Sequence, residues 1–97
     1  MKRERKPLND ENNNNEEAGG LYFNEKSRLI SISGIISWQL ADEFFNVLTG
    51  FESLLSKRPL TIYINSEGGE TYAMFKIYDH IRNSPLFIIT VVAGQAS

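Results

Sequence analysis

Residues 60–69 read Leu-Thr-Ile-Tyr-Ile-Asn-Ser-Glu-Gly-Gly, and this stretch carries the strongest fold signal in the chain. Aliphatic side chains occupy every second position from Leu60 to Ile64, with β-branched residues through the middle, which predicts a strand. Asn65 and Ser66 favour a turn, and Gly68-Gly69 breaks the strand because glycine frees the backbone. A strand that ends in such a turn is typical of α/β folds, in which ligands sit at the carboxyl ends of strands.

Similar patterns lie on both sides of this stretch. The alternation before Gly34 predicts a strand over 28–36, and a helix capped by Ser37 follows. The remaining elements are a helix with Ala73, Ile77 and Ile81 on one face, and an apolar strand over 86–92. The first helix carries its apolar residues at Leu40, Phe44, Val47, Leu48, Phe51 and Leu55. The order strand–helix–strand–helix–strand predicts an α/β layer structure, and the apolar run over 86–92 predicts a strand covered on both faces.

Composition narrows the class of protein. The 97 residues carry a net charge of −2 with both signs interspersed, so no basic stripe favours binding to nucleic acid or to a membrane. No apolar run approaches the roughly 18 residues of a membrane span, and a cytoplasmic location is expected. Residues 1–20 are charged, rich in asparagine and poor in apolar side chains, which predicts a disordered arm ahead of a domain over 21–97.

Two turns carry candidate chemistry. Exposed amides at Gly68-Gly69 can form a donor cluster for an anionic oxygen, although a plain strand-to-helix turn explains the same residues. Ser97 follows the last strand, where several hydrolases present a nucleophile, yet a lone serine is weak evidence. His80, the single histidine, is expected to be solvated or to face another subunit, and no cluster of metal ligands is evident.

Four segments together resemble the Clp protease proteolytic subunit family, a branch of the crotonase-like superfamily. They are the strand at 28–36, the run at 62–69, Ile77-Tyr78-Asp79, and the stretch at 90–97. The second is similar to the family's Asn-Ser-Pro-Gly-Gly signature, with Glu67 in place of the proline. The resemblance implies a crotonase-like fold, of which 21–97 forms the N-terminal half as a layered βαβαβ half-domain.

The resemblance also implies roles for single residues. The amide of Gly69, aided by Gly68, is an oxyanion donor, and Glu70-Thr71 pairs with the substrate backbone as an added strand. The family's nucleophilic serine falls directly after Ser97, so Ser97 takes that role only if one residue has been deleted. The family's catalytic histidine and aspartate lie further downstream, and His80 does not correspond to that histidine. We therefore expect the 97 residues alone to be inactive, with no cofactor and no metal.

The resemblance implies an assembly as well. Family members stack two seven-membered rings into a tetradecamer and receive unfolded proteins from an AAA+ ATPase unfoldase. The arm at 1–20 lies where the family has a propeptide or axial-pore loops. Alternatives remain open: a non-catalytic ring paralogue, and a crotonase-like acyl-CoA enzyme that shares the fold and an oxyanion hole. Glu67 and the asparagine-rich arm also leave open a phage-type or signal-peptide-peptidase-like relative.

Overall fold

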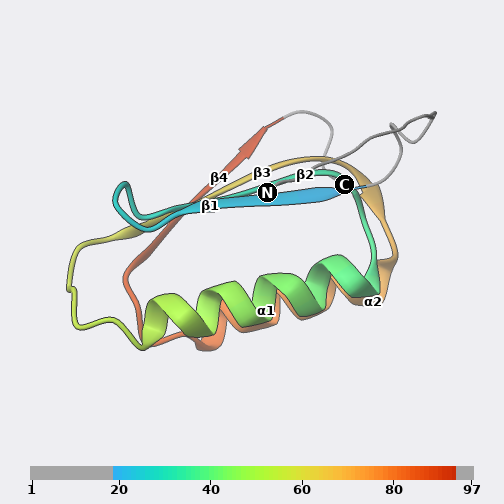
Figure 1. The fold of residues 1–97 in the computed structure, drawn as a ribbon. Coiled ribbons are helices and arrows are strands. Elements are labelled where there is room, and N and C mark those ends of the chain that lie inside the picture. Colours follow the sequence, from blue (N-terminus) through green and yellow to red (C-terminus); the bar gives the residue numbers. More distant parts are fainter. Residues whose placement is uncertain (1–18, 94–97) are drawn as a thin grey trace, which may run out of the picture.

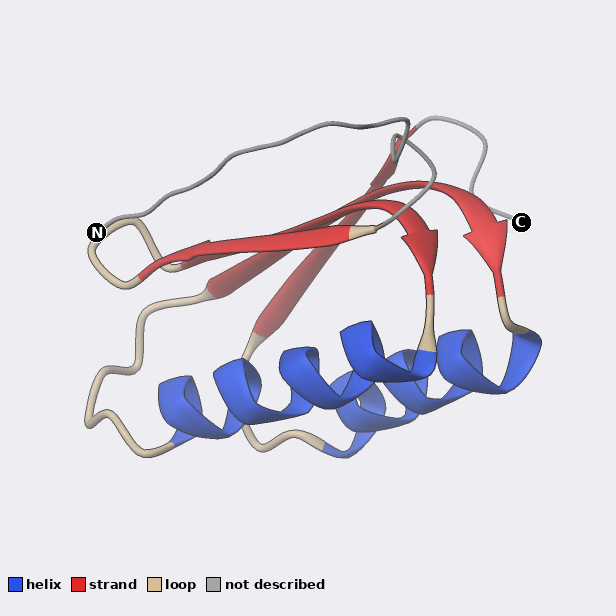
Figure 2. Cartoon of the chain, turned by 45° about the vertical axis from the view of Figure 1, so that its right-hand side comes forward, coloured by secondary structure: helices blue, strands red, loops and turns tan. Residues whose placement is uncertain are grey.

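The computed structural model describes residues 19–93, apart from the side chain of Glu67. Four strands form one sheet and two helices pack on one of its faces, as Figures 1 and 2 show from two directions. In chain order the elements are β1 (Gly20–Asn24), β2 (Leu29–Ile36), α1 (Trp38–Glu52), β3 (Leu60–Gly69), α2 (Thr71–Asn83) and β4 (Ile88–Ala93). None of the helices within residues 19–93 is long and apolar enough to cross a membrane.

The strands lie in the order β1-β2-β3-β4. The three strands β2, β3 and β4 are parallel, which confirms the predicted βαβαβ unit, while β1 pairs antiparallel with β2. The sequence predicts that order begins near Leu21 but predicts no strand there. As an edge strand, β1 keeps only Leu21 and Asn24 half-buried, so it lacks the alternating burial that marks β2.

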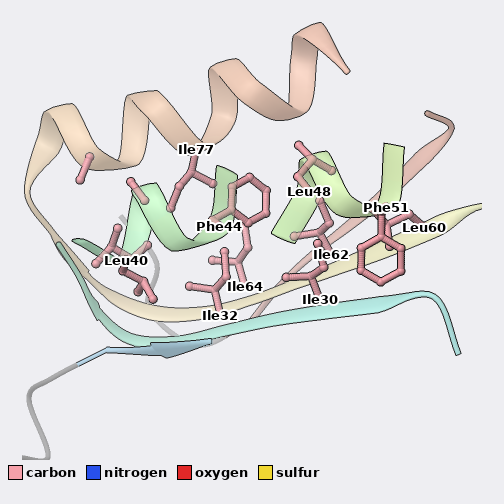
Figure 3. Packing of buried hydrophobic residues seen from close by; sticks show 13 residues of the cluster. Ile30, Ile32, Leu40, Phe44, Leu48, Phe51, Leu60, Ile62, Ile64 and Ile77 are labelled. Atoms are coloured by element: carbon pink, nitrogen blue, oxygen red, sulfur yellow. The ribbon is translucent and has the colours of Figure 1, made fainter. Parts of the chain in front are cut away.

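The core lies between the helices and one face of the sheet (Figure 3). Ile30 and Ile32 from β2 lie in register with Ile62 and Ile64 from β3, so their side chains form one continuous apolar floor. The helix residues that pack onto this floor are Leu40, Ala41, Phe44, Leu48, Phe51, Ala73 and Ile77. The helical and strand periodicities of the sequence thus meet in a single core.

The structure tests the expected start and the expected end of α1. Ser37 caps α1 as expected, because its Oγ accepts a hydrogen bond from the amide of Leu40 at 3.2 Å. The expected extension of the helix to Leu55 is wrong. The helix ends at Glu52, where Ser53 closes its last turn by donating from its amide and its hydroxyl, and Leu55 is 100% exposed.

The expectation that the last strand is covered on both faces is also wrong for the described residues. Both helices lie on the same side of the sheet, which leaves the other face open (Figure 2). On that open face Tyr63 lies in register with Val91, and both side chains are exposed. On the helix side, Val92 is still 53% exposed because β4 forms the edge of the sheet. A strand with a nearly continuous apolar sequence therefore need not be covered on both faces by the part of the chain to which it belongs.

Candidate functional site

The carboxyl ends of β2 and β3 meet around one buried serine. The side chain of Ser66 is almost wholly buried, and its Oγ donates to the carbonyl oxygen of Gly34 at 2.7 Å. The same Oγ lies 2.9 Å from the amide nitrogen of Gly68, from which it accepts a hydrogen bond. The predicted turn residue Ser66 is thus the link between two strand ends, and the register of β2 against β3 shifts at this level, between Ser33 and Ile35.

The glycine pair is required by the backbone that follows. Gly68 and Gly69 have φ values of 124° and 151°, a region that L side chains rarely adopt. A Cβ on Gly69 would lie 2.3 Å from the carbonyl oxygen of Ile36. The prediction that the two glycines end the strand is wrong. They let β3 continue to Gly69 in close contact with the end of β2.

The hydrogen-bond pattern decides where the amide of Gly69 points. Ile36 is the register partner of Gly69, and its carbonyl oxygen accepts from the amide of Glu70 at 3.0 Å. In a parallel ladder, a residue that hydrogen-bonds to the neighbouring strand bonds to the residues just before and just after its register partner. The N–H and C=O of the register partner itself then point to the other side of its strand. The N–H of Gly69 is therefore directed away from β2, as an oxyanion donor would require.

The side of β3 that Gly69 faces is open in the described chain. Pairing between β3 and β4 ends at Asn65 and Ala93, so no described strand pairs with the segment from Ser66 to Gly69 on that side. A cavity of about 300 Å³ lies next to this edge. Its walls are mainly apolar and come from Gly69, Thr71, Met74, Phe75 and Tyr78. The arrangement offers a strand edge, an outward amide and an apolar recess side by side.

Glu70 and Thr71 occupy the start of α2, directly after Gly69. The backbone of Glu70 already has partners on both sides, because its amide donates to Ile36 and its carbonyl accepts from Met74. Its carboxylate Oε1 accepts from the amide of Trp38 at 3.0 Å and thereby caps the first turn of α1. Thr71 begins the helix, so its amide is one of the donors that a helix leaves without an intrahelical partner. The pairing of Glu70-Thr71 with a substrate stays a prediction.

His80 lies farther along α2, and its ring packs on another helix instead of lying free in solvent. The alternative that it faces another subunit stays a prediction. The ring of His80 packs against Phe45 of α1, with ring centroids 4.5 Å apart, and its Nε2 is buried without a hydrogen-bond partner among residues 19–93. The sequence could not indicate this contact, because it depends on how α1 and α2 lie beside each other. Ser97, the candidate nucleophile, lies outside the described residues, as do Gly94 to Ala96.

The geometry agrees with what comparison to known proteins finds. The model of the Clp protease family matches residues 15–97. The chain belongs to the Clp protease family. It is 37% identical over 75 residues to the ATP-dependent Clp protease proteolytic subunit 2 of Treponema denticola. The subunit of the same name from Borreliella burgdorferi is 38% identical over 69 residues.

The matches cover most of this chain but only part of each relative. The aligned segment is 73% of this chain and 38% of the Treponema denticola protein, and 71% and 35% for the Borreliella burgdorferi protein. Among solved structures, ClpP1 from Listeria monocytogenes superimposes with a TM-score of 0.66 at 34% identity, over 72% of this chain and 41% of that one. The Clp-type fold is thereby confirmed. The acyl-CoA enzyme and the non-catalytic paralogue are not favoured, since these relatives are named as Clp protease subunits or ClpP1.

Proposed function

We propose that this chain forms part of the peptidase subunit of an ATP-dependent Clp-type protease that cleaves unfolded proteins by serine chemistry. The observation that carries the proposal is the outward amide of Gly69 at the open edge of β3. In this site the amide stabilises the oxyanion of the tetrahedral intermediate, and a fixed donor of this kind contributes about 10²–10³ in kcat.

The substrate lies beside the same edge. An extended peptide adds to β3 along Ser66 to Gly69, using backbone groups that no described strand occupies. One of its side chains enters the apolar recess next to Gly69. Recognition through the backbone and one apolar side chain tolerates many sequences, which suits the degradation of unfolded chains.

The remaining parts of the proposal rest on family membership. The assembly is a stacked ring that receives its substrate from an AAA+ ATPase, and the protein acts in the cytoplasm. We expect that the 97 residues alone do not complete a triad. Their one histidine, His80, packs on Phe45 and lies about 14 Å along α2 from Thr71 at 1.5 Å per residue.

A chimera tests the proposal. Residues 19–97 replace the matching segment of the Treponema denticola subunit, and hydrolysis of a fluorogenic peptide is measured with and without a serine-directed reagent. We expect reagent-sensitive hydrolysis by the chimera and none by the isolated 97-residue chain. Gly69→Ala in the chimera should abolish most of the activity, whereas Gly50→Ala, on the exposed side of α1, should retain it. A folded chimera without activity, or reagent-sensitive turnover by the isolated chain, would contradict the proposal.

A further inference from the structure

Arg28, at the start of β2, is a buried cation with an unusual setting. The residue is only 3% exposed, and its backbone has a φ of 56°, in the left-handed region that non-glycine residues seldom adopt. The guanidinium donates from Nη2 to the carbonyl oxygen of Arg58 at 2.8 Å, and its carbon atom lies 5.5 Å from the centre of the Phe51 ring. The fold therefore holds this side chain inside by several contacts.

Most of the hydrogen-bonding capacity of Arg28 is unused. Its Nε and Nη1 are buried and have no hydrogen-bond partner within the described part of the chain. These two nitrogens carry three of the five N–H donors of a guanidinium. A buried charge without a counterion is costly, and unpaired buried donors usually indicate an absent water or ion. The Arg28 site is thus short of an anionic acceptor.

A neighbouring arginine gives an internal contrast. Arg58 makes the reciprocal bond, from its Nη2 to the carbonyl oxygen of Lys26 at 2.9 Å, but it is exposed to solvent. The two arginines fasten the β1–β2 turn to the loop before β3. Because Arg58 is exposed to water, Arg28 is the one of these two arginines that needs a ligand to satisfy its charge.

A cavity of about 260 Å³ lies against the aromatic wall of this site. Its lining is Phe23, Glu25, Asn46, Val47, Gly50 and Phe51. The Phe51 ring is shared, since it contacts Arg28 and packs edge-on against Phe23 at 6.3 Å between centroids. The apolar walls favour a ligand with a short hydrocarbon tail. The Glu25 carboxylate disfavours a multiply charged anion such as phosphate.

We propose that Arg28 is the receptor of a binding site for a small monocarboxylate, whose tail lies in the cavity that Phe23, Val47 and Phe51 help to line. The carboxylate oxygens accept from Nε and Nη1, and the β1–β2 turn opens locally to admit the anion because both nitrogens are closed to solvent. The site lies at the amino end of β2, opposite the strand ends that carry Gly69, so it does not depend on the proposed peptidase function.

The test uses the 97-residue chain with sodium acetate, sodium butyrate, or sodium chloride at matched ionic strength. The Nε–H signals of the arginines are followed by NMR, and the signal missing from Arg28→Met identifies Arg28. We expect that signal to move saturably with acetate, and with butyrate at lower concentration. The thermal midpoint should rise in carboxylate relative to chloride for the wild type and for Arg58→Met, but not for Arg28→Met.

Three results would overturn the site. One is an equal rise of the midpoint in the wild type and in Arg28→Met. Another is an Arg28 Nε–H signal in the wild type that moves with neither carboxylate, which decides the question even if Arg28→Met does not fold. The third is evidence that Glu25 already pairs with Arg28 within the chain. In that case acetate has no effect, and Glu25→Gln lowers the thermal midpoint of the wild type but not that of Arg28→Met.

Discussion

The hydroxyl of Ser66 lies 2.7 Å from the carbonyl oxygen of Gly34, a residue 32 positions earlier in the chain. Gly34 has a φ of 81°, and the register between β2 and β3 shifts beside it. The same hydroxyl accepts from the amide of Gly68. One side chain therefore joins the register shift in β2 to the glycine pair in β3, and through that pair it helps to position Gly69.

We expect Ser66→Ala to destabilise the chain by about 1–3 kcal/mol, because the part-buried carbonyl of Gly34 and the buried amide of Gly68 both lose their bond to Ser66. Urea denaturation followed by circular dichroism measures the change. Ser33→Ala is the control, since Ser33 is exposed on β2 and should alter stability by less than about 0.5 kcal/mol. Equal effects of the two substitutions would mean that the Ser66 bonds contribute nothing specific.

Two leucines near the end of α1 test the extent of the core. Leu48 is buried between α1 and the sheet, whereas Leu55 is fully exposed beyond the helix end. Leu48→Ala should cost about 2–5 kcal/mol, and Leu55→Ala should change stability by less than about 0.5 kcal/mol. Guanidinium denaturation of both variants gives the comparison. A large loss of unfolding free energy in Leu55→Ala would mean that the Leu55 side chain makes a contact that the described residues do not provide.

The sequence predicts the central elements well because their periodicity records burial. Ile30, Ile32, Ile62 and Ile64 alternate in the sequence and all face the core. Periodicity does not reveal the partner of an edge strand, so the sequence does not predict β1. It also does not reveal which face of β4 is covered.

The candidate site shows a similar division. Residue type predicts exposed amides at Gly68 and Gly69, but the amide of Gly68 donates to Ser66 inside the turn. The role of Gly69 as an oxyanion donor is what the resemblance implies. The links from Ser66 to Gly34 and from Glu70 to Trp38 join residues 32 positions apart, and no local pattern records them. The packing of His80 on Phe45 likewise depends on the angle between two helices.

Two glycines with opposite surroundings test the close approach at the site. Gly69→Ala would place a Cβ 2.3 Å from the carbonyl oxygen of Ile36, so we expect a loss of more than about 1 kcal/mol. Gly50 lies within α1, and a Cβ there meets no atom within 4 Å, so Gly50→Ala should stabilise by about 0.5–1 kcal/mol. Thermal unfolding of both variants should move in opposite directions. Stabilisation by Gly69→Ala would contradict the geometry of the β3 end.

Glu70 tests whether the start of α1 is fixed from the start of α2. Its carboxylate accepts from the amide of Trp38, and its charge lies at the positive end of the α1 dipole. Glu70→Ala loses the hydrogen bond and the charge and should cost about 0.5–2 kcal/mol. Glu70→Gln keeps an oxygen acceptor and should cost only about 0.3–1 kcal/mol, a loss that shrinks in 1 M salt. Urea denaturation at low and high salt separates the two contributions, with Glu43→Gln on the exposed side of α1 as control. If Glu70→Ala is no worse than that control, the Trp38 amide does not depend on Glu70, and the two helix starts are positioned by the strands alone.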